Sequence, residues 1–221
     1  MHRYPSYVLA VTLLVLAALV VLAAPRASGQ VLIDRIVARV ESDIILLSQV
    51  RILSRYQQLV DGKAEDDAQI LDRLVDQWIV RSEADTARFP QPADVEVAHG
   101  VEHLQASFAS IEEYQARKKQ AGLSDADVQR MVAEQLYLSN YLDSRFRPAV
   151  QITPKEIEDF YQQAVLPRAK ARNQAPPALD SSREYIQEAL VQRGINEQAD
   201  RWLKESRARL HVEKFLDQGA K

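Results

Sequence analysis

The sequence contains no cysteine, which excludes a disulfide scaffold, a thiol nucleophile and any cysteine-based zinc or iron–sulfur site. Its six glycines include no adjacent pair and no spacing typical of a phosphate-binding loop, so nucleotide-dependent chemistry is not expected. The 28 basic and 31 acidic residues give a formal net charge of -3, which offers nucleic acid no general electrostatic attraction. No serine stands in a G-x-S-x-G motif, so a hydrolytic triad has little support. We therefore expect no cofactor and no nucleic-acid partner.

The overall composition lies in the globular range. The chain has 221 residues, of which 47% are hydrophobic and 27% are charged. These values fit neither a disordered chain nor a protein with many membrane spans. One main domain is expected.

The amino terminus is typical of an export signal. Residues 7–24 form an uncharged apolar stretch after Arg3, and small residues at 27–29 fit signal cleavage before Gln30. The stretch is also just long enough to cross a hydrocarbon layer of about 30 Å, so an uncleaved inner-membrane anchor is the alternative. In either case we expect the rest of the chain to lie in the periplasm, with membrane contact only through an uncleaved residue 1–29 segment.

Hydrophobic patterning predicts a mainly α-helical fold with a small antiparallel β element. Residues 31–40 are rich in β-branched side chains, and a turn at 41–43 leads to apolar residues 44–46, which together predict a hairpin. Partial alternation over 210–216 predicts a carboxyl-terminal strand that returns to this hairpin. Helical spacing and capping signals predict helices over residues 48–60, 66–87, 97–108, 110–121, 124–146, 153–165 and 182–210.

Residues 167–180 differ from the predicted helices around them. Their sequence, PRAKARNQAPPALD, holds Arg168, Lys170 and Arg172, two adjacent prolines and almost nothing apolar to bury. We expect this segment to be a linker. The following helix is expected to begin at Ser181 or Ser182.

Three stretches, taken in order along the chain, resemble the SurA-type periplasmic chaperones. DRIVARVESDIILLSQV at 34–50 is similar to the opening hairpin and first helix of that family. ILDRLVDQWIVRSEA at 70–84 is similar to its second helix, and INEQADRWLKESRARLHVEKF at 195–215 to its closing helix and strand. The resemblance implies a helical chaperone module over residues 30–166, completed by residues 181–221.

The resemblance also implies a function. Relatives bind unfolded or nascent exported polypeptides without ATP, and outer-membrane protein precursors are the clients that it suggests. Many relatives insert prolyl isomerase domains between helices that correspond to 153–165 and 182–193 here. The intervening 167–180 is too short to fold as such a domain, because chains below about 40 residues rarely hold a core unaided. A chaperone without isomerase activity is therefore the expected function. The two alternatives are a prolyl isomerase with another kind of active site and a membrane-tethered interaction module.

Aromatic and methionine side chains are the candidate client-binding residues. A helix that is apolar beyond its core stripe can present a second surface, and residues 131, 137 and 141 fall on more than one face of their predicted helix. Trp78 and Trp202 lie in strong apolar stripes and are expected in the core. The candidate set is Phe108, Tyr114, Met131, Tyr137, Tyr141, Phe160 and Tyr161.

One motif suggests metal chemistry. His99, Glu102 and His103 match the H-x-x-E-H pattern, in which two histidines one helical turn apart bind zinc and the carboxylate activates water. The sequence offers no identifiable third ligand, and the buried stripe of the same helix is expected to include Val101 and Leu104. We therefore expect these three polar side chains to face solvent and assign no metal and no catalytic residue.

Overall fold

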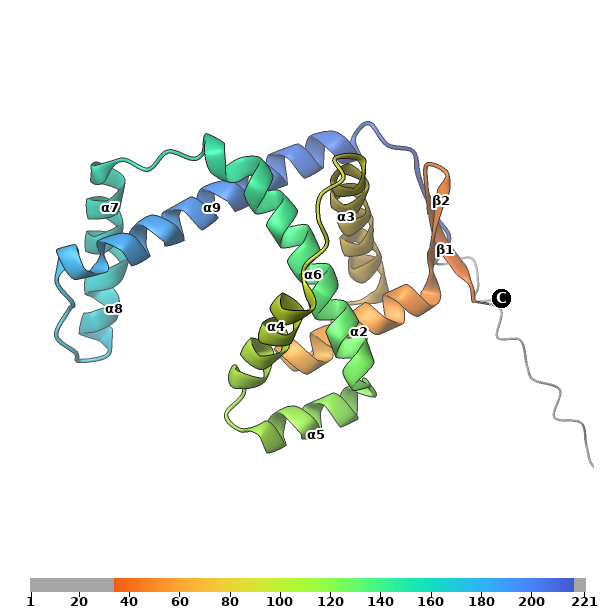
Figure 1. Cartoon of the computed structure of the whole chain (residues 1–221), viewed down its shortest axis with the longest axis horizontal. Helices are drawn as coiled ribbons and strands as arrows, with labels where there is room; N and C mark the ends of the chain where they lie inside the picture. The colour runs from red at the N-terminus through yellow and green to blue at the C-terminus, as the bar shows by residue number, and fades with distance from the viewer. Residues whose placement is uncertain (1–33, 217–221) are drawn as a thin grey trace, which may run out of the picture. The chain divides into compact units, whose positions relative to one another are not determined.

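The computed structural model describes residues 34–216, and the expected leader at 1–29 lies outside the described residues (Figure 1). The described chain is mainly helical with one small antiparallel sheet, which confirms the expected fold class. Within it, no helix is both long enough and apolar enough to cross a bilayer. The helices are α2 (Leu47–Asp61), α3 (Asp67–Thr86), α4 (Asp94–Ala106), α5 (Ile111–Ala121), α6 (Asp125–Phe146), α7 (Pro154–Phe160), α8 (Leu166–Ala171) and α9 (Leu179–Arg207).

The sheet joins the two ends of the described chain. Strands β1 (Ile36–Val40) and β2 (Asp43–Leu46) form the predicted hairpin, and β3 (Val212–Lys214) pairs antiparallel with the other side of β1. The amide of Phe215 donates to the carbonyl of Val37 at 2.8 Å. The predicted return of the carboxyl-terminal strand is confirmed.

The first hydrophobic core lies between the sheet and helices α2 and α3. Val37 and Val40 of β1 are fully buried against Val50 of α2 and Val75 of α3. Trp78 and Trp202 both pack against this core but remain partly exposed. Their expected core position is therefore confirmed only in part.

A second core lies where α2, α4, α5 and α6 meet. Val97, Val101, Leu104 and Phe108 pack against it, as the spacing in this segment predicts. Gly100, on the same helix, comes so close to α6 that a Cβ atom there would lie 2.6 Å from a Val132 methyl carbon.

Helix starts follow the predicted chemistry where Ser or Thr stands three residues before Asp or Glu. Ser110, Ser124 and Thr153 each accept a hydrogen bond from a backbone amide in the first turn of α5, α6 and α7. The predicted cap of α2 is wrong. Helix α2 begins beyond Leu46, whose amide donates to the Gln49 side chain, so Ser48 is not its cap.

The segment expected to be a linker is partly helical. Residues 161–165 form a π-helical segment, η2, that leads directly into α8. Of the expected linker at 167–180, only residues 172–178 are outside a helix. Pro167 explains the π geometry, because proline has no amide hydrogen and its ring would clash with the carbonyl four residues earlier in a regular α-helix. Helix α9 then begins at Leu179, earlier than predicted, and Ser182 is buried inside it with its hydroxyl donating to the Ala178 carbonyl.

Helices α7 and α9 share a third core. Ile157 of α7 packs with Ile186 and Leu190 of α9, and the Tyr161 hydroxyl donates to the Pro177 carbonyl at 2.7 Å. Residues 167–180 thus connect two helices that pack on each other. Helix α9 is continuous through Gly194, which confirms the uninterrupted helix considered from the sequence.

Candidate functional site

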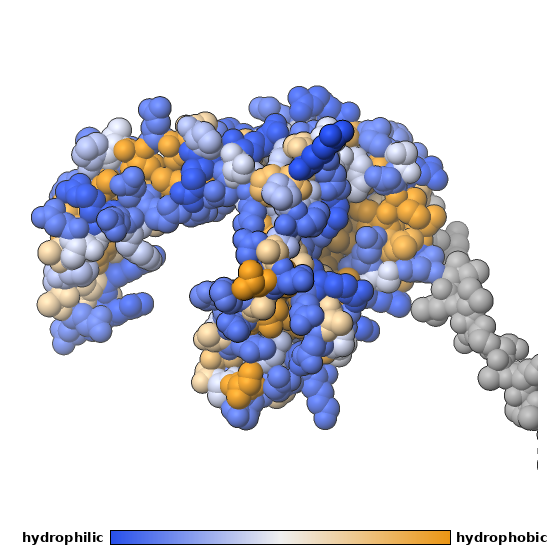
Figure 2. Space-filling model, viewed as in Figure 1, coloured by the Kyte–Doolittle hydropathy of each residue, from blue (hydrophilic) through white to orange (hydrophobic). Residues whose placement is uncertain are grey.

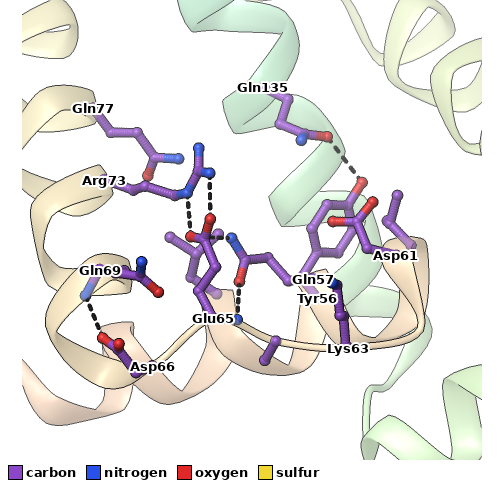
Figure 3. A pocket seen from close by; sticks show the side chains of 13 residues that line it. Tyr56, Gln57, Asp61, Lys63, Glu65, Asp66, Gln69, Arg73, Gln77 and Gln135 are labelled. Carbon is purple, nitrogen blue, oxygen red and sulfur yellow. Dashed lines mark hydrogen bonds and ion pairs between the residues drawn. The ribbon is translucent and has the colours of Figure 1, made fainter.

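A groove of about 730 Å³ opens between α2, the α2–α3 connection, α3 and one residue of α6 (Figure 3). The chain turns sharply at Gly62, whose φ of 74° is accessible to glycine without steric cost. Asp66 then caps α3 by accepting the Gln69 amide hydrogen at 2.8 Å. These two end signals fix the connection that forms one wall of the groove.

The floor of the groove is apolar. Leu53 and Tyr56 of α2 are 6% and 3% exposed, and Val60, one turn further along, is 40% exposed. The Tyr56 hydroxyl donates to the side-chain oxygen of Gln135 at 2.9 Å. Burial raises the pKa of Tyr56 to about 12, so the phenol keeps its proton at neutral pH.

An ion pair holds the α2–α3 connection against α3. Arg73 donates through Nη2 to Glu65 at 2.6 Å and also through Nε. The Gln57 carboxamide donates to the Glu65 carboxylate and accepts the Glu65 amide hydrogen, both at 3.1 Å. The hydrogen bonds from Arg73 and Gln57 lower the pKa of Glu65 to about 2. Because these charges are paired, they fix the wall of the groove.

Glutamine carboxamides surround the opening. Gln57, Gln69, Gln77 and Gln135 come from three helices and all line the groove (Figure 3). Within residues 34–216, the carboxamides of Gln69 and Gln77 and the NH₂ group of Gln135 make no hydrogen bond. A carboxamide both donates and accepts hydrogen bonds, as a peptide group does. The rim can therefore bond to polypeptide main chain whatever its side chains are.

The groove offers binding groups and no catalytic pair. Its lining contains no histidine and no hydroxyl other than the Tyr56 phenol. Of its five charged residues, Glu65 and Arg73 neutralise each other and Asp66 caps α3, while Asp61 and Lys63 add one charge of each sign. This chemistry suits reversible binding of a ligand that has both apolar and amide groups.

Three of the candidate client-binding residues are buried, which corrects the expected second surface on α6. Tyr114, Tyr137 and Tyr141 are 1%, 1% and 5% exposed. The Tyr137 hydroxyl donates to Asp85 at 2.6 Å, and the Tyr141 hydroxyl accepts from Arg145 at 2.8 Å. These tyrosines are buried among the packed helices and are not available to a client in this structure.

The other four candidates are partly exposed but are not brought together. Phe108 packs on the second core and Met131 between the first and second, while Phe160 and Tyr161 lie in the third. None of them lines the groove. None of the groove residues was predicted from the sequence. Four of them are glutamines, two exposed and two half-buried, and they follow no pattern in the sequence.

The residues of the metal motif lie on the outside of α4. His99, Glu102 and His103 are all exposed. Within residues 34–216 the structure contains no group of three or more histidine, aspartate or glutamate side chains placed to hold a metal ion.

No protein-family model matches this sequence, and no curated protein matches it.

Proposed function

We propose that the protein is an ATP-independent chaperone that binds unfolded exported polypeptides. The observation that carries this proposal is the groove beside α2, which combines an apolar floor with a rim of glutamine carboxamides. An unfolded chain exposes apolar side chains and unpaired peptide groups together. A site that offers both apolar contacts and carboxamide hydrogen bonds can bind many sequences weakly, which is what a chaperone for varied clients needs.

Exposed apolar side chains elsewhere supply further contacts for a long client. On the side of the molecule that Figure 2 shows, apolar patches are separated by hydrophilic surface. Separate patches engage an extended chain at several points while the charged surface keeps the protein soluble. Among residues 34–216, the large exposed apolar residues are Ile36, Ile44, Val60, Val95, Ile111 and Tyr185.

The location and the clients follow from the sequence. The apolar stretch at 7–24 favours export, and a compartment without ATP suits a chaperone that has no phosphate-binding loop. The resemblance of residues 34–50, 70–84 and 195–215 to SurA-type chaperones suggests outer-membrane protein precursors as clients. The strands of such proteins alternate apolar and polar residues, so each strand would offer one apolar face to the groove.

The test is suppression of aggregation by purified protein without nucleotide. A chemically denatured client is diluted into buffer with an equimolar amount of the protein, and light scattering is followed. Val60→Asp places a charge on the groove floor and should reduce suppression, as should Gln69→Ala combined with Gln77→Ala. Ala116→Asp is the matched control, because Ala116 is exposed on α5, does not line the groove and is not one of the large exposed apolar residues. Equal suppression by all variants would remove the groove from the account.

A further inference from the structure

A second pocket, of about 370 Å³, lies between α9 and the segment that joins η1 (Arg147–Ala149) to α7. In Figure 1 this segment runs alongside α9. The two come close because α9 has no side chain at Gly194, where a Cβ atom would lie 2.8 Å from a Val150 methyl carbon. The pocket therefore lies between residues 149–152 on one side and α9 on the other.

The helix wall carries two arginines without ion-pair partners. Arg193 and Arg201 both line the pocket, and neither forms a salt bridge or a side-chain hydrogen bond within residues 34–216. The Arg193 guanidinium lies 5.9 Å from the centre of the Phe160 ring, which supports it from one side. By contrast, Arg147 in η1 is paired with Asp143 and Glu188.

Two carboxylates complete the charge pattern. Glu156 is occupied as the cap of α7, where it accepts hydrogen bonds from the amide and the hydroxyl of Thr153, both at 2.7 Å. Glu197 stands one helical turn from each arginine and pairs with neither within 34–216. Along α9 the pocket therefore presents positive, negative and positive groups in that order, one turn apart.

The opposite wall offers unpaired main chain. Val150 has an extended backbone, with φ of -89° and ψ of 119°. Within the described residues, the amides of Gln151 and Ile152 and the carbonyls of the same two residues make no backbone hydrogen bond. Unpaired groups on an extended segment are what an added strand bonds to.

We propose that this pocket is a second polypeptide site, which takes an extended segment with acidic side chains four residues apart. The two arginines are eight residues apart on α9, which is about 12 Å at 1.5 Å per residue. Side chains four residues apart on an extended strand are about 13 Å apart and lie on the same face. The ligand residue midway between the two acidic residues, two positions from each, would face Glu197 and should be basic or neutral.

This inference deepens the proposed function and rests on it. Client segments with this charge pattern would be held at α9, while apolar segments of any sequence bind in the groove beside α2. The main chain of the segment would pair with residues 151–152, so binding needs free amide hydrogens on the ligand.

The experiment measures fluorescence anisotropy of three labelled ten-residue peptides with the full protein. The first has glutamates at positions 3 and 7 and a lysine at 5, the second has these charges reversed, and the third has glutamine at all three positions. We expect the first to bind most tightly. Because exposed ion pairs each change affinity about two- to fivefold, Arg193→Gln with Arg201→Gln should weaken the first peptide about tenfold and abolish the preference.

The control variant is Arg183→Gln, on the same helix but paired with Asp180 and outside the pocket. It should leave the preference unchanged, and circular dichroism should show all variants folded. N-methylation of alternate amides in the first peptide should also remove its binding. Equal binding of the three peptides, or a preference that survives the double substitution, overturns the inference. Suppression of aggregation of an uncharged client by the double variant separates that result from failure of the chaperone proposal.

Discussion

The hydroxyl of Tyr56 donates a hydrogen bond to the side chain of Gln135 and so ties α2 to α6 across the floor of the groove. The bond occupies the carboxamide oxygen of Gln135 and leaves the NH₂ group free to face the groove (Figure 3). One contact thus links the stability of the second core to the binding groups of the candidate site.

Tyr56→Phe should lower the free energy of unfolding by about 1 kcal/mol, because one partly buried hydrogen bond is lost while the ring remains. Client binding should persist, since the Gln135 carboxamide stays at the rim and gains a free acceptor. Urea denaturation and aggregation assays of the same preparation check both parts. A loss of suppression with unchanged stability would mean that the phenol itself binds the client.

Gly100→Ala should destabilise the protein although alanine favours helix by about 1 kcal/mol over glycine. The new methyl group would meet Val132 at 2.6 Å and a Leu136 methyl carbon at 3.2 Å. Overpacking of this kind costs about 1–3 kcal/mol, which exceeds the gain in helix propensity. Thermal unfolding measures the change, and Val132→Ala in the same chain should relieve part of it. A more stable Gly100→Ala variant would show that α4 moves away from α6 at no cost.

The stabilising contribution of Glu65 should be lost at acid pH. Its pKa is lowered to about 2 in the folded protein from an ordinary value of 4.5, so the charged form is favoured by folding. The contribution is complete above about pH 4.5 and is lost as the pH falls toward 2. Glu65→Gln removes this titration, and urea midpoints measured between pH 5 and pH 2 should fall less steeply in the variant. Parallel curves for the two proteins would contradict the assignment of the ion pair.

Pro167→Ala should convert the π-helical segment to regular α-helix. Proline cannot donate the helical hydrogen bond and its ring excludes the preceding carbonyl, and both effects disappear with alanine. The stability should rise by up to about 3 kcal/mol, the cost of proline inside a helix. Hydrogen exchange detects the change directly, because the new amide at 167 should be protected. Fast exchange at that amide would show that something other than proline imposes the π geometry.

The sequence predicted the elements whose signals are local. The capping pairs at Ser110 and Ser124 require only neighbouring residues, so the starts of α5 and α6 were foreseen. The start of α2 was missed because the capping group is the side chain of Gln49, inside the helix, whereas Ser48 is the residue type that usually caps a helix. The helix over Leu166–Ala171 was missed because basic residues and proline are typical of loops. Its only buried residue is an alanine, so it also lacks an apolar stripe.

The site was harder to predict because it depends on contacts between distant helices. Periodicity identifies which residues share a helix face, and it does not reveal how many faces have neighbours. Helix α6 packs against α2, α3, α4 and α9, so Tyr137 and Tyr141, one turn apart on α6, are both buried. The groove forms only where Gln135 of α6 meets α2 and α3. Nothing in the local sequence marks that meeting point.

Photo-cross-linking from the groove tests the central claim most directly. A photoreactive amino acid placed at Gln77 lies at the rim, and one placed at Gln120 is exposed on α5 and does not line the groove. With an unfolded client present at equimolar concentration, the account predicts a protein–client adduct from position 77 that exceeds that from position 120 and disappears when the client is folded. Equal adducts from both positions, or none from position 77, would contradict it.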